Sequence, residues 1–489
     1  MTPDFPAWSS DFQRHLRRLR SCDEAHAPPL LHQFQLLFQP WVPTHLLAQE
    51  DQGPHSRSRR WPLRLTFWTF LWQVAQVGAS CREAVYQAAT VCRLQGRPVP
   101  RLEDGPYCVA RAALPVDRLE QIHSTLVQNA QSALATKDLW QGHRVYVADG
   151  TTVTLPDTPA NQAAFPQQSV QKPGCGFPIL RLTGLFCLAT GLLVAWATGN
   201  WHRHELQLLN QLWEHLSAGD VLLGDRGFCT YGILARCHFL KLHAVVRARG
   251  RLRRDFRRGK RLGPEAREVT WTKSVKCPRT IEPELWEQLP DTLTLRLVRC
   301  RLGRAGFRSQ QILLITTLRD QERYPVEALA ALYLRRWDME LSLRHLKTTL
   351  QMEHLSCRSP QTVERELRLH LLVHNLVRRL MLESARTHRI ALPRVSFAGA
   401  LAGARRTAEA LLQARTQKLR RQLFDQLIKS MAHDAVPERP GRREPRALKR
   451  RPKPFPVLTS HRHHFKEPSH TNRYYNPNRR RKPPGNSQP

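Results

Sequence analysis

Two short stretches of apolar, β-forming residues constrain the fold most, because each of them runs into an aspartate. Residues 145–148 lead directly to Asp149, and residues 221–223 lead through Gly224 to Asp225. Such stretches predict buried strands. A single aspartate after a strand is usually a turn residue. Two such strand ends, joined by a third carboxylate on a later helix, instead form an arrangement that binds two divalent cations for phosphoryl displacement.

The third carboxylate is Glu340, which lies in a segment predicted to be one helix over residues 325–352. Tyr333, Arg336, Glu340 and Lys347 follow one another at offsets of three, seven and fourteen residues. At about 100° per residue, these offsets place the four side chains within roughly 60° of one another. A solvated charged face would account for a generic helix of this composition. The strand-end aspartates favour the interpretation as a catalytic stripe.

This stripe suggests metal-assisted chemistry on a phosphodiester. Hard cations such as Mg²⁺ take oxygen ligands, so we expect the three carboxylates to bind two Mg²⁺ ions, with Mn²⁺ as a substitute. Arg336 and Lys347 would hold phosphates beside the cut. Tyr333 would contact a phosphate or stack on a displaced base. Asp338 and Glu353 lie about 160° and 140° around the helix from Glu340 and are not expected to take part.

The charge balance predicts a polyanionic partner. Lys and Arg number 76 against 40 Asp and Glu, a formal net charge of +36, which indicates nucleic acid or an anionic membrane. The apolar residues 179–196 contain Arg181 and resemble paired strands more than a membrane span. No secretory signal is expected in the polar N-terminal segment, and the eleven cysteines include no Cys-x-x-Cys pair. We therefore expect a cytoplasmic, nucleoid-associated protein that binds double-stranded DNA and no membrane.

Changes in composition divide the chain into six parts. We expect a helical, DNA-binding N-terminal region (1–140), the first part of the catalytic core (141–240), a β-rich insertion (241–320), core helices (321–390), C-terminal helices (391–435) and a basic disordered tail (436–489). Strands are predicted at 269–273, 292–302 and 311–318, after an arginine-rich hairpin-like region at 247–261. Amphipathic helices are predicted at 205–216 and 362–388. Residues 441–489 hold fourteen Lys and Arg against two Glu, so disorder is expected there.

The motifs together resemble a known enzyme family. Residues 333–347 match the pattern Tyr-x2-Arg-x3-Glu-x6-Lys at every spacing, which is the hallmark of the DDE transposases of the bacterial insertion-sequence-four family. Residues 149–152, Asp-Gly-Thr-Thr, are similar to the first aspartate motif of that family. Residues 225–228, Asp-Arg-Gly-Phe, are similar to the second. The resemblance extends over roughly residues 107–374.

The resemblance implies a ribonuclease-H-like core with a β-rich insertion before the last catalytic residue. It also implies cut-and-paste transposition: Mg²⁺-dependent cleavage at terminal inverted repeats, followed by strand transfer into target DNA by at least a dimer. Members of this family are thought to release the element through a hairpin at its end, with an aromatic residue holding a flipped base. Trp271 or Phe256 would serve that role here.

Two other functions share some of these features. A ribonuclease-H-like nuclease that cuts without joining would have the same metal site. A non-catalytic DNA-binding regulator would bind DNA without needing metal. The size of the insertion disfavours the first alternative. The intact set of three carboxylates disfavours the second, because buried carboxylates held together without a cation are costly.

Overall fold

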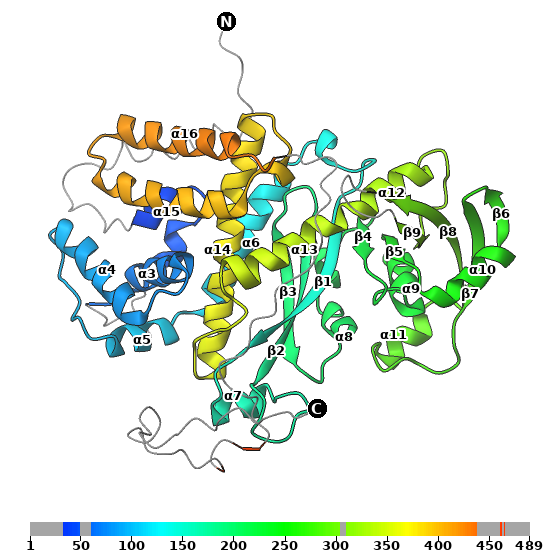
Figure 1. Cartoon of the computed structure of the whole chain (residues 1–489), viewed down its shortest axis with the longest axis horizontal. Coiled ribbons are helices and arrows are strands. Elements are labelled where there is room, and N and C mark those ends of the chain that lie inside the picture. Colours follow the sequence, from blue (N-terminus) through cyan, green and yellow to red (C-terminus); the bar gives the residue numbers. More distant parts are fainter. Residues whose placement is uncertain (1–32, 49–59, 304–309, 438–459, 462–463, 465–489) are drawn as a thin grey trace, which may run out of the picture.

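Nine strands form one continuous sheet with helices on both faces (Figure 1). The computed structural model describes residues 33–48, 60–303, 310–437, 460–461 and 464. The strands lie in the order β3-β2-β1-β4-β5-β9-β8-β7-β6. Their bounds are β1 Val145–Thr154, β2 Ile179–Cys187, β3 Leu193–Asn200, β4 Val221–Gly224, β5 His243–Arg247, β6 Lys260–Gly263, β7 Ala266–Thr272, β8 Thr292–Leu302 and β9 Gln310–Thr316. The chain is therefore a mixed α/β protein, as predicted.

The first five strands combine a meander with two crossovers. β2 pairs antiparallel with both β1 and β3, whereas β4 lies parallel to β1 and β5 lies parallel to β4. Parallel neighbours need a crossover connection, which helices provide here. α8 (Glu205–Leu209) lies between β3 and β4, and α9 (Tyr231–Phe239) lies between β4 and β5. The single helix predicted over 205–216 is wrong in length, since a 3₁₀ turn, Trp213–His215, forms separately after α8.

The strands of the predicted insertion extend the same sheet. β9 pairs antiparallel with β5, and β8, β7 and β6 follow in antiparallel order. The three strands predicted here are found as β7, β8 and β9. The hairpin predicted at 247–261 is wrong, because α10 (Arg253–Arg258) forms there after a 3₁₀ turn, Gly250–Leu252. Arginine is a good helix former, so a run rich in it accommodates a helical turn readily.

Helices make up the rest of the described chain. They are α2 Gln33–Phe38, α3 Leu63–Gln76, α4 Cys81–Leu94, α5 Gly105–Ala112, α6 Val116–Ser132, α7 Pro159–Ala164, α11 Pro283–Gln288, α12 Val326–Leu334, α13 Arg336–Arg344, α14 Pro360–Thr387, α15 Phe397–Gln413 and α16 Gln417–His433, with short 3₁₀ turns at Thr44–Leu47, Thr136–Asp138 and Leu392–Arg394. Within the described part of the chain, none combines the length and apolar character needed to cross a bilayer. Residues 1–32 and nearly all of the tail predicted to be disordered lie outside the described residues.

The two faces of the sheet bury separate cores. Side chains alternate between faces along a strand, so Val145 and Val147 enter one core, whereas Tyr146 and Ala148 enter the other. The first core also contains residues of α3, α12, α13, α14 and α15. The second contains residues of α8, α9 and α11. Each face of β1 is therefore covered by its own helical layer.

α14 is the central helix of the first layer and confirms the helix predicted at 362–388. It contacts α3, α5, α6, α15 and α16. Ser359 caps its N-terminus by accepting a hydrogen bond from the Thr362 amide, and Pro360 occupies the first helical position. Because other helices surround most of it, 19 of its 28 residues are buried, including polar ones such as His370, His374 and Arg378.

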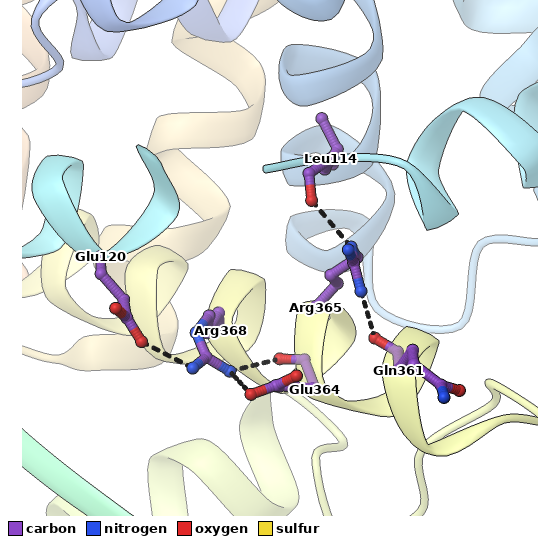
Figure 2. Close-up of polar contacts among 6 residues, drawn as sticks. All are labelled: Leu114, Glu120, Gln361, Glu364, Arg365 and Arg368. Atoms are coloured by element: carbon purple, nitrogen blue, oxygen red, sulfur yellow. Dashed lines mark hydrogen bonds and ion pairs between the residues drawn. The ribbon is translucent and has the colours of Figure 1, made fainter. Parts of the chain in front are cut away.

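Two arginines of α14 join it to the N-terminal helices (Figure 2). Arg365 Nε donates to the Leu114 carbonyl oxygen at 2.8 Å. Arg368 Nη2 donates to Glu120 Oε1 at 2.6 Å, and its Nη1 lies 3.0 Å from Glu364 Oε1. The N-terminal helices therefore pack as part of the same body as the strands that carry the aspartates.

The single helix predicted over 325–352 is wrong in detail. The chain forms α12, then α13, then a π-helical segment, His345–Thr349. Arg335 joins the first two and keeps α-like dihedral angles, so the direction of the chain changes little there. The i→i+5 bonding of a π-helix rotates the residues that follow it relative to a continuous α-helix. The side-chain positions predicted for one continuous α-helix are therefore expected to hold up to Glu340 and to fail near Lys347.

Candidate active site

The two strand aspartates lie level with each other at one end of the parallel pair. Val147 of β1 pairs with Leu223 of β4, and Asp149 and Asp225 each follow two residues later. Adjacent strands are about 4.8 Å apart, and side chains two residues apart point to the same face. Both aspartates therefore share the face of Val147, which is the face on which α13 packs.

The prediction that β1 ends at Asp149 is wrong. The strand continues to Thr154, because residues 149–154 pair with β2. This continuation is rich in Thr and Val, which favour strands. The pairing with β4 nevertheless stops at Val147. Asp149 therefore still stands just past the carboxyl end of the parallel pair, where the prediction placed it.

Backbone amides orient both carboxylates. The Gly150 amide donates to Asp149 Oδ1 at 2.9 Å, and the Gly227 amide donates to Asp225 Oδ1 at 2.6 Å. The second bond is the local turn in which an aspartate accepts from the amide two residues on. Each bond leaves the other carboxylate oxygen available to a further partner.

Three of the four predicted stripe residues come together on α12 and α13. Tyr333 is buried at the end of α12, and the guanidinium carbon of Arg336 lies 5.7 Å from the centroid of its ring. Arg336 Nη2 donates to Glu340 Oε1 at 2.5 Å. The Arg336 side chain is 11% exposed and that of Glu340 is 51% exposed. The carboxylate of Glu340 is thus paired with a nearly buried cation while remaining open to solvent.

Lys347 pairs with a carboxylate outside this group. It belongs to the π-helical segment, and its Nζ is 3.7 Å from Glu353 Oε1. Ideal α-helical geometry predicts that Glu353 lies on a different side of the helix from Glu340. Glu353 follows the π-helical segment, so the single α-helix predicted over 325–352 does not describe this pair.

The surroundings of Asp149 disfavour its charged form. Burial, helped by the charges of Asp225 and Glu340, raises the pKa of Asp149 to about 6, although the Gly150 amide and Arg336 oppose the change. Burial also raises the pKa of Tyr333, against the effect of Arg336. These contributions indicate that Asp225 and Glu340 lie near enough to Asp149 for their charges to act on it.

Sequence reasoning missed a fourth carboxylate, Glu205, which is the first residue of α8. Burial raises its pKa to about 7, and Asp149 and Asp225 contribute in the same direction, while Arg181 opposes them. Glu205 follows β3 by several residues and belongs to no motif. The position of Glu205 near β1 could not be predicted from spacing in the sequence, because it depends on how α8 packs on the sheet.

A cavity of about 370 Å³ opens beside Asp225 and is strongly basic. Its lining includes five arginines, Arg226, Arg247, Arg249, Arg257 and Arg299. Arg226 directly follows Asp225 in sequence, and Arg249 Nε donates to its carbonyl oxygen at 3.4 Å. Part of the arginine-rich region noted in the sequence therefore contacts the residues that directly follow Asp225.

Neither aromatic residue predicted to hold a flipped base is fully open to a ligand. Phe256 lines the basic cavity but is buried, and the guanidinium carbons of Arg267 and Arg299 lie 4.9 and 5.0 Å from its ring centroid. Trp271 is partly buried against the second core. The role of either residue stays a prediction.

The donor chemistry fits divalent cations, although the side chains are not gathered around one point. Among the described residues, no three His, Cys, Asp or Glu side chains are arranged to hold one metal ion. Glu340 is directed to Arg336 instead of the aspartates. Asp149 and Asp225 present level carboxylate oxygens, which are the ligands that Mg²⁺ prefers. A half-exposed Glu340 needs only a side-chain rotation to leave Arg336.

Comparisons with known proteins agree with the motifs. The family described as Transposase DDE domain matches residues 140–376. The transposase InsG for insertion sequence element IS4 of Escherichia coli (strain K12) is 28% identical over 412 residues, which cover 82% of this chain and 88% of that protein. A cryo-EM structure of the piggyBac transposase synaptic complex with hairpin DNA aligns with 83% of this chain and 85% of its own, at 10% identity and a TM-score of 0.37, a likeness too distant to carry an argument. These two matches support a DDE transposase of the insertion-sequence-four family, whose members cleave DNA and transfer its strands.

Proposed function

We propose that this transposase performs cut-and-paste transposition of an insertion sequence. It cleaves double-stranded DNA at the terminal inverted repeats of its element and joins the released ends to target DNA, through a hairpin intermediate. The ribonuclease-H-like core implied by the motifs is consistent with the mixed sheet and its level aspartates. The synaptic complex is a dimer that holds both ends and works in the cytoplasm at the nucleoid.

The catalytic and metal-binding residues in this proposal are Asp149, Asp225 and Glu340. The observation that carries it is the register of β1 and β4, which sets the two aspartates side by side beneath the helix that bears Glu340. Two bound Mg²⁺ ions, or Mn²⁺ in their place, supply activation of the attacking oxygen and stabilisation of the leaving oxygen. The protein contributes a rigid strand pair, amide hydrogen bonds that fix each aspartate, and a helix that delivers the third carboxylate.

Tyr333, Arg336 and Lys347 contact the DNA. Arg336 has a planar guanidinium suited to bidentate phosphate binding, and its place on the Tyr333 ring limits the side chain to few orientations. When a phosphate takes the place of Glu340 on Arg336, Glu340 becomes available to the aspartates. The arginine-lined cavity beside Asp225 extends the basic surface along which a DNA strand would lie.

The test is a cleavage assay on the element's own end. The full-length protein is incubated with Mg²⁺ and a labelled duplex that carries an inverted repeat, and the products are separated on a denaturing gel. We expect nicked and joined products from the wild type and none from Asp225→Asn or Glu340→Gln, both of which still bind the duplex. Glu327→Gln, which changes an exposed carboxylate in the first turn of α12, is the matched control and should cleave normally.

Each other result identifies a different function. Cleavage without joining would indicate a nuclease. Binding without any metal-dependent cut would indicate a regulator. Cleavage by Glu340→Gln at the wild-type rate would contradict its assignment as a catalytic carboxylate.

A further inference from the structure

Two consecutive helices of the N-terminal region, α3 and α4, are joined by a tight turn. α3 ends at Gln76 and α4 begins at Cys81, so residues 77–80 connect them. Val77 and Gly78 have φ of 56° and 85°, in the left-handed region that favours glycine. DNA-binding helix-turn-helix motifs join their two helices by a turn of about three or four residues, often containing glycine. The connection between α3 and α4 is of this kind.

A capping box fixes the start of α4. The Glu83 amide donates to Ser80 Oγ at 3.2 Å, and the Ser80 amide donates to Glu83 Oε2 at 2.6 Å. These two bonds satisfy amides that the beginning of a helix leaves without partners. Glu83 is the one acidic residue of α4, and its carboxylate is held at the N-terminus of the helix. The rest of α4 therefore carries no negative charge.

α4 has a buried face and an exposed, basic face. Its buried residues are small and apolar: Ala84, Val85, Ala88, Ala89, Val91 and Cys92. Its exposed residues include Arg82, Tyr86, Thr90 and Arg93. At about 100° per residue, these four lie within roughly 80° of one another. Among the described residues, the side chains of Arg82 and Arg93 make no hydrogen bond or ion pair. This face therefore offers two unpaired cations together with two hydroxyl-bearing side chains.

α4 lies at the outer edge of the helical layer (Figure 1). It packs mainly on α3 and α5. α3 is itself buried along almost its whole length and packs on α14, so it gives α4 a rigid support. A helix with its side chains is about 10–12 Å across, and the major groove of DNA is about 12 Å wide. α4 therefore has the size, support and charge of a helix that enters this groove.

We propose that α4 enters the major groove of the terminal inverted repeat, with α3 as its supporting helix. Residues near the N-terminus of such a helix contact base edges, so Arg82 and Tyr86 face the bases, and the guanidinium of Arg82 binds a guanine. Arg93, near the other end of α4, binds a backbone phosphate. This inference rests on the proposed function, since it requires that the protein recognises the ends of its element. It names one helix within residues 1–140, the region that the sequence assigned to DNA binding.

The experiment measures binding of the full-length protein to two labelled duplexes of equal length by fluorescence anisotropy, with EDTA present to prevent cleavage. One duplex carries the inverted repeat, and the other carries a shuffled sequence. Arg82→Ala should weaken binding to the repeat by about tenfold or more and reduce the preference for the repeat by a similar factor. Arg93→Ala should weaken binding to both duplexes, with a slope of log affinity against log salt that is smaller by about one unit.

Arg406→Ala is the matched control. It removes the same charge from an exposed position on α15 and should bind both duplexes as the wild type does. All three substitutions are at exposed positions, so the variants should melt at the same temperature as the wild type. Coincident melting curves exclude unfolding as the cause of any loss of binding.

The wild type separates this inference from the proposed function. If it binds both duplexes equally, the ends are not recognised and the proposed function fails. If it prefers the repeat and the variants of Arg82 and Arg93 bind as it does, the proposed function stands and α4 is not the recognition helix. The exposed face of α4 then has a partner other than DNA, such as a second copy of this chain. If Arg82→Ala weakens binding to both duplexes equally, α4 contacts the backbone without reading bases, and the inference is wrong as well.

Discussion

Acid should destabilise this protein through histidines buried around α14, and His370 provides the cleanest case. Its side chain is 7% exposed, and burial lowers its pKa to about 4, against a smaller opposite effect of Glu366. Its Nδ1 has no hydrogen-bond partner among the described residues. The imidazole is therefore held neutral by burial.

The sign of the effect follows from proton binding. The unfolded chain protonates this imidazole below about pH 6.5, whereas the native chain does so only below pH 4. Between these values the unfolded state binds more protons, so stability falls as the pH falls. At pH 5, about 1.5 units below the unfolded pKa, the loss is about 2 kcal/mol for one histidine. At pH 7 it is close to zero.

His123 and His374 are also buried, and burial lowers the pKa of His123 to about 4 and that of His374 well below its usual value. The three histidines together would remove about 6 kcal/mol at pH 5. This is comparable with the whole stability of a typical domain, about 5–15 kcal/mol. Mild acid should therefore unfold the helical layer that supports α13.

Urea unfolding of the wild type and of His370→Leu at pH 7 and pH 5 tests this reasoning. Leucine removes the titrating group from an apolar site, so His370→Leu should lose about 2 kcal/mol less than the wild type on acidification. His388→Leu, at an exposed position just past α14, should lose as much as the wild type. An equal loss in wild type and His370→Leu would refute the argument.

Three further changes have defined outcomes. DNA binding is titrated across salt concentrations, and the slope of log affinity against log salt is compared between the wild type and Lys347→Ala. The variant should have a slope smaller by about one unit if the lysine neutralises one phosphate. An unchanged slope would exclude that contact. Arg368→Met should lower the free energy of unfolding in urea by about 1–2 kcal/mol, because it breaks the pair with Glu120. The cost stays small because water can solvate the half-exposed glutamate that remains. A loss near zero would mean that this ion pair does not stabilise the helical layer. Gly191→Ala should lower the free energy of unfolding by about 2 kcal/mol or more. Gly191 has φ of 71°, and an added Cβ would lie 2.4 Å from Nη2 of buried Arg378. An alanine variant as stable as the wild type would contradict this reasoning.

Local periodicity was sufficient to predict much of the site. The alternation of side chains along a strand places Asp149 on the face of Val147, and the equal distance of both aspartates from paired residues sets them level. Helical spacing likewise predicts the contacts of Arg336 with Tyr333 and Glu340. The spacing along each strand and helix is local and can be predicted from the sequence, whereas the pairing of β1 with β4 that sets the aspartates level is a finding of the structure.

Relations between distant segments were not predictable in the same way. Glu205 reaches Gly150 because α8 packs on the second face of the sheet, which no local pattern specifies. The strands of the predicted β-rich insertion extend the core sheet through the pairing of β9 with β5, which the sequence pattern did not specify. Lys347 lies in a segment whose hydrogen bonding is of the π type, which the predicted continuous α-helix did not anticipate. Each of these features depends on tertiary packing.

The distribution of charge explains how acids and DNA can share one site. A phosphodiester is repelled by a group of carboxylates unless cations nearby exceed them in charge. Five arginines line the cavity beside Asp225, and Arg336 pairs with Glu340 on the facing helix. The excess of basic residues in the whole chain, +36, draws DNA in from a distance, but salt screens that attraction within about 10 Å. The arginines of the cavity would act within this range, so under the proposed function they would position a phosphate near the acids.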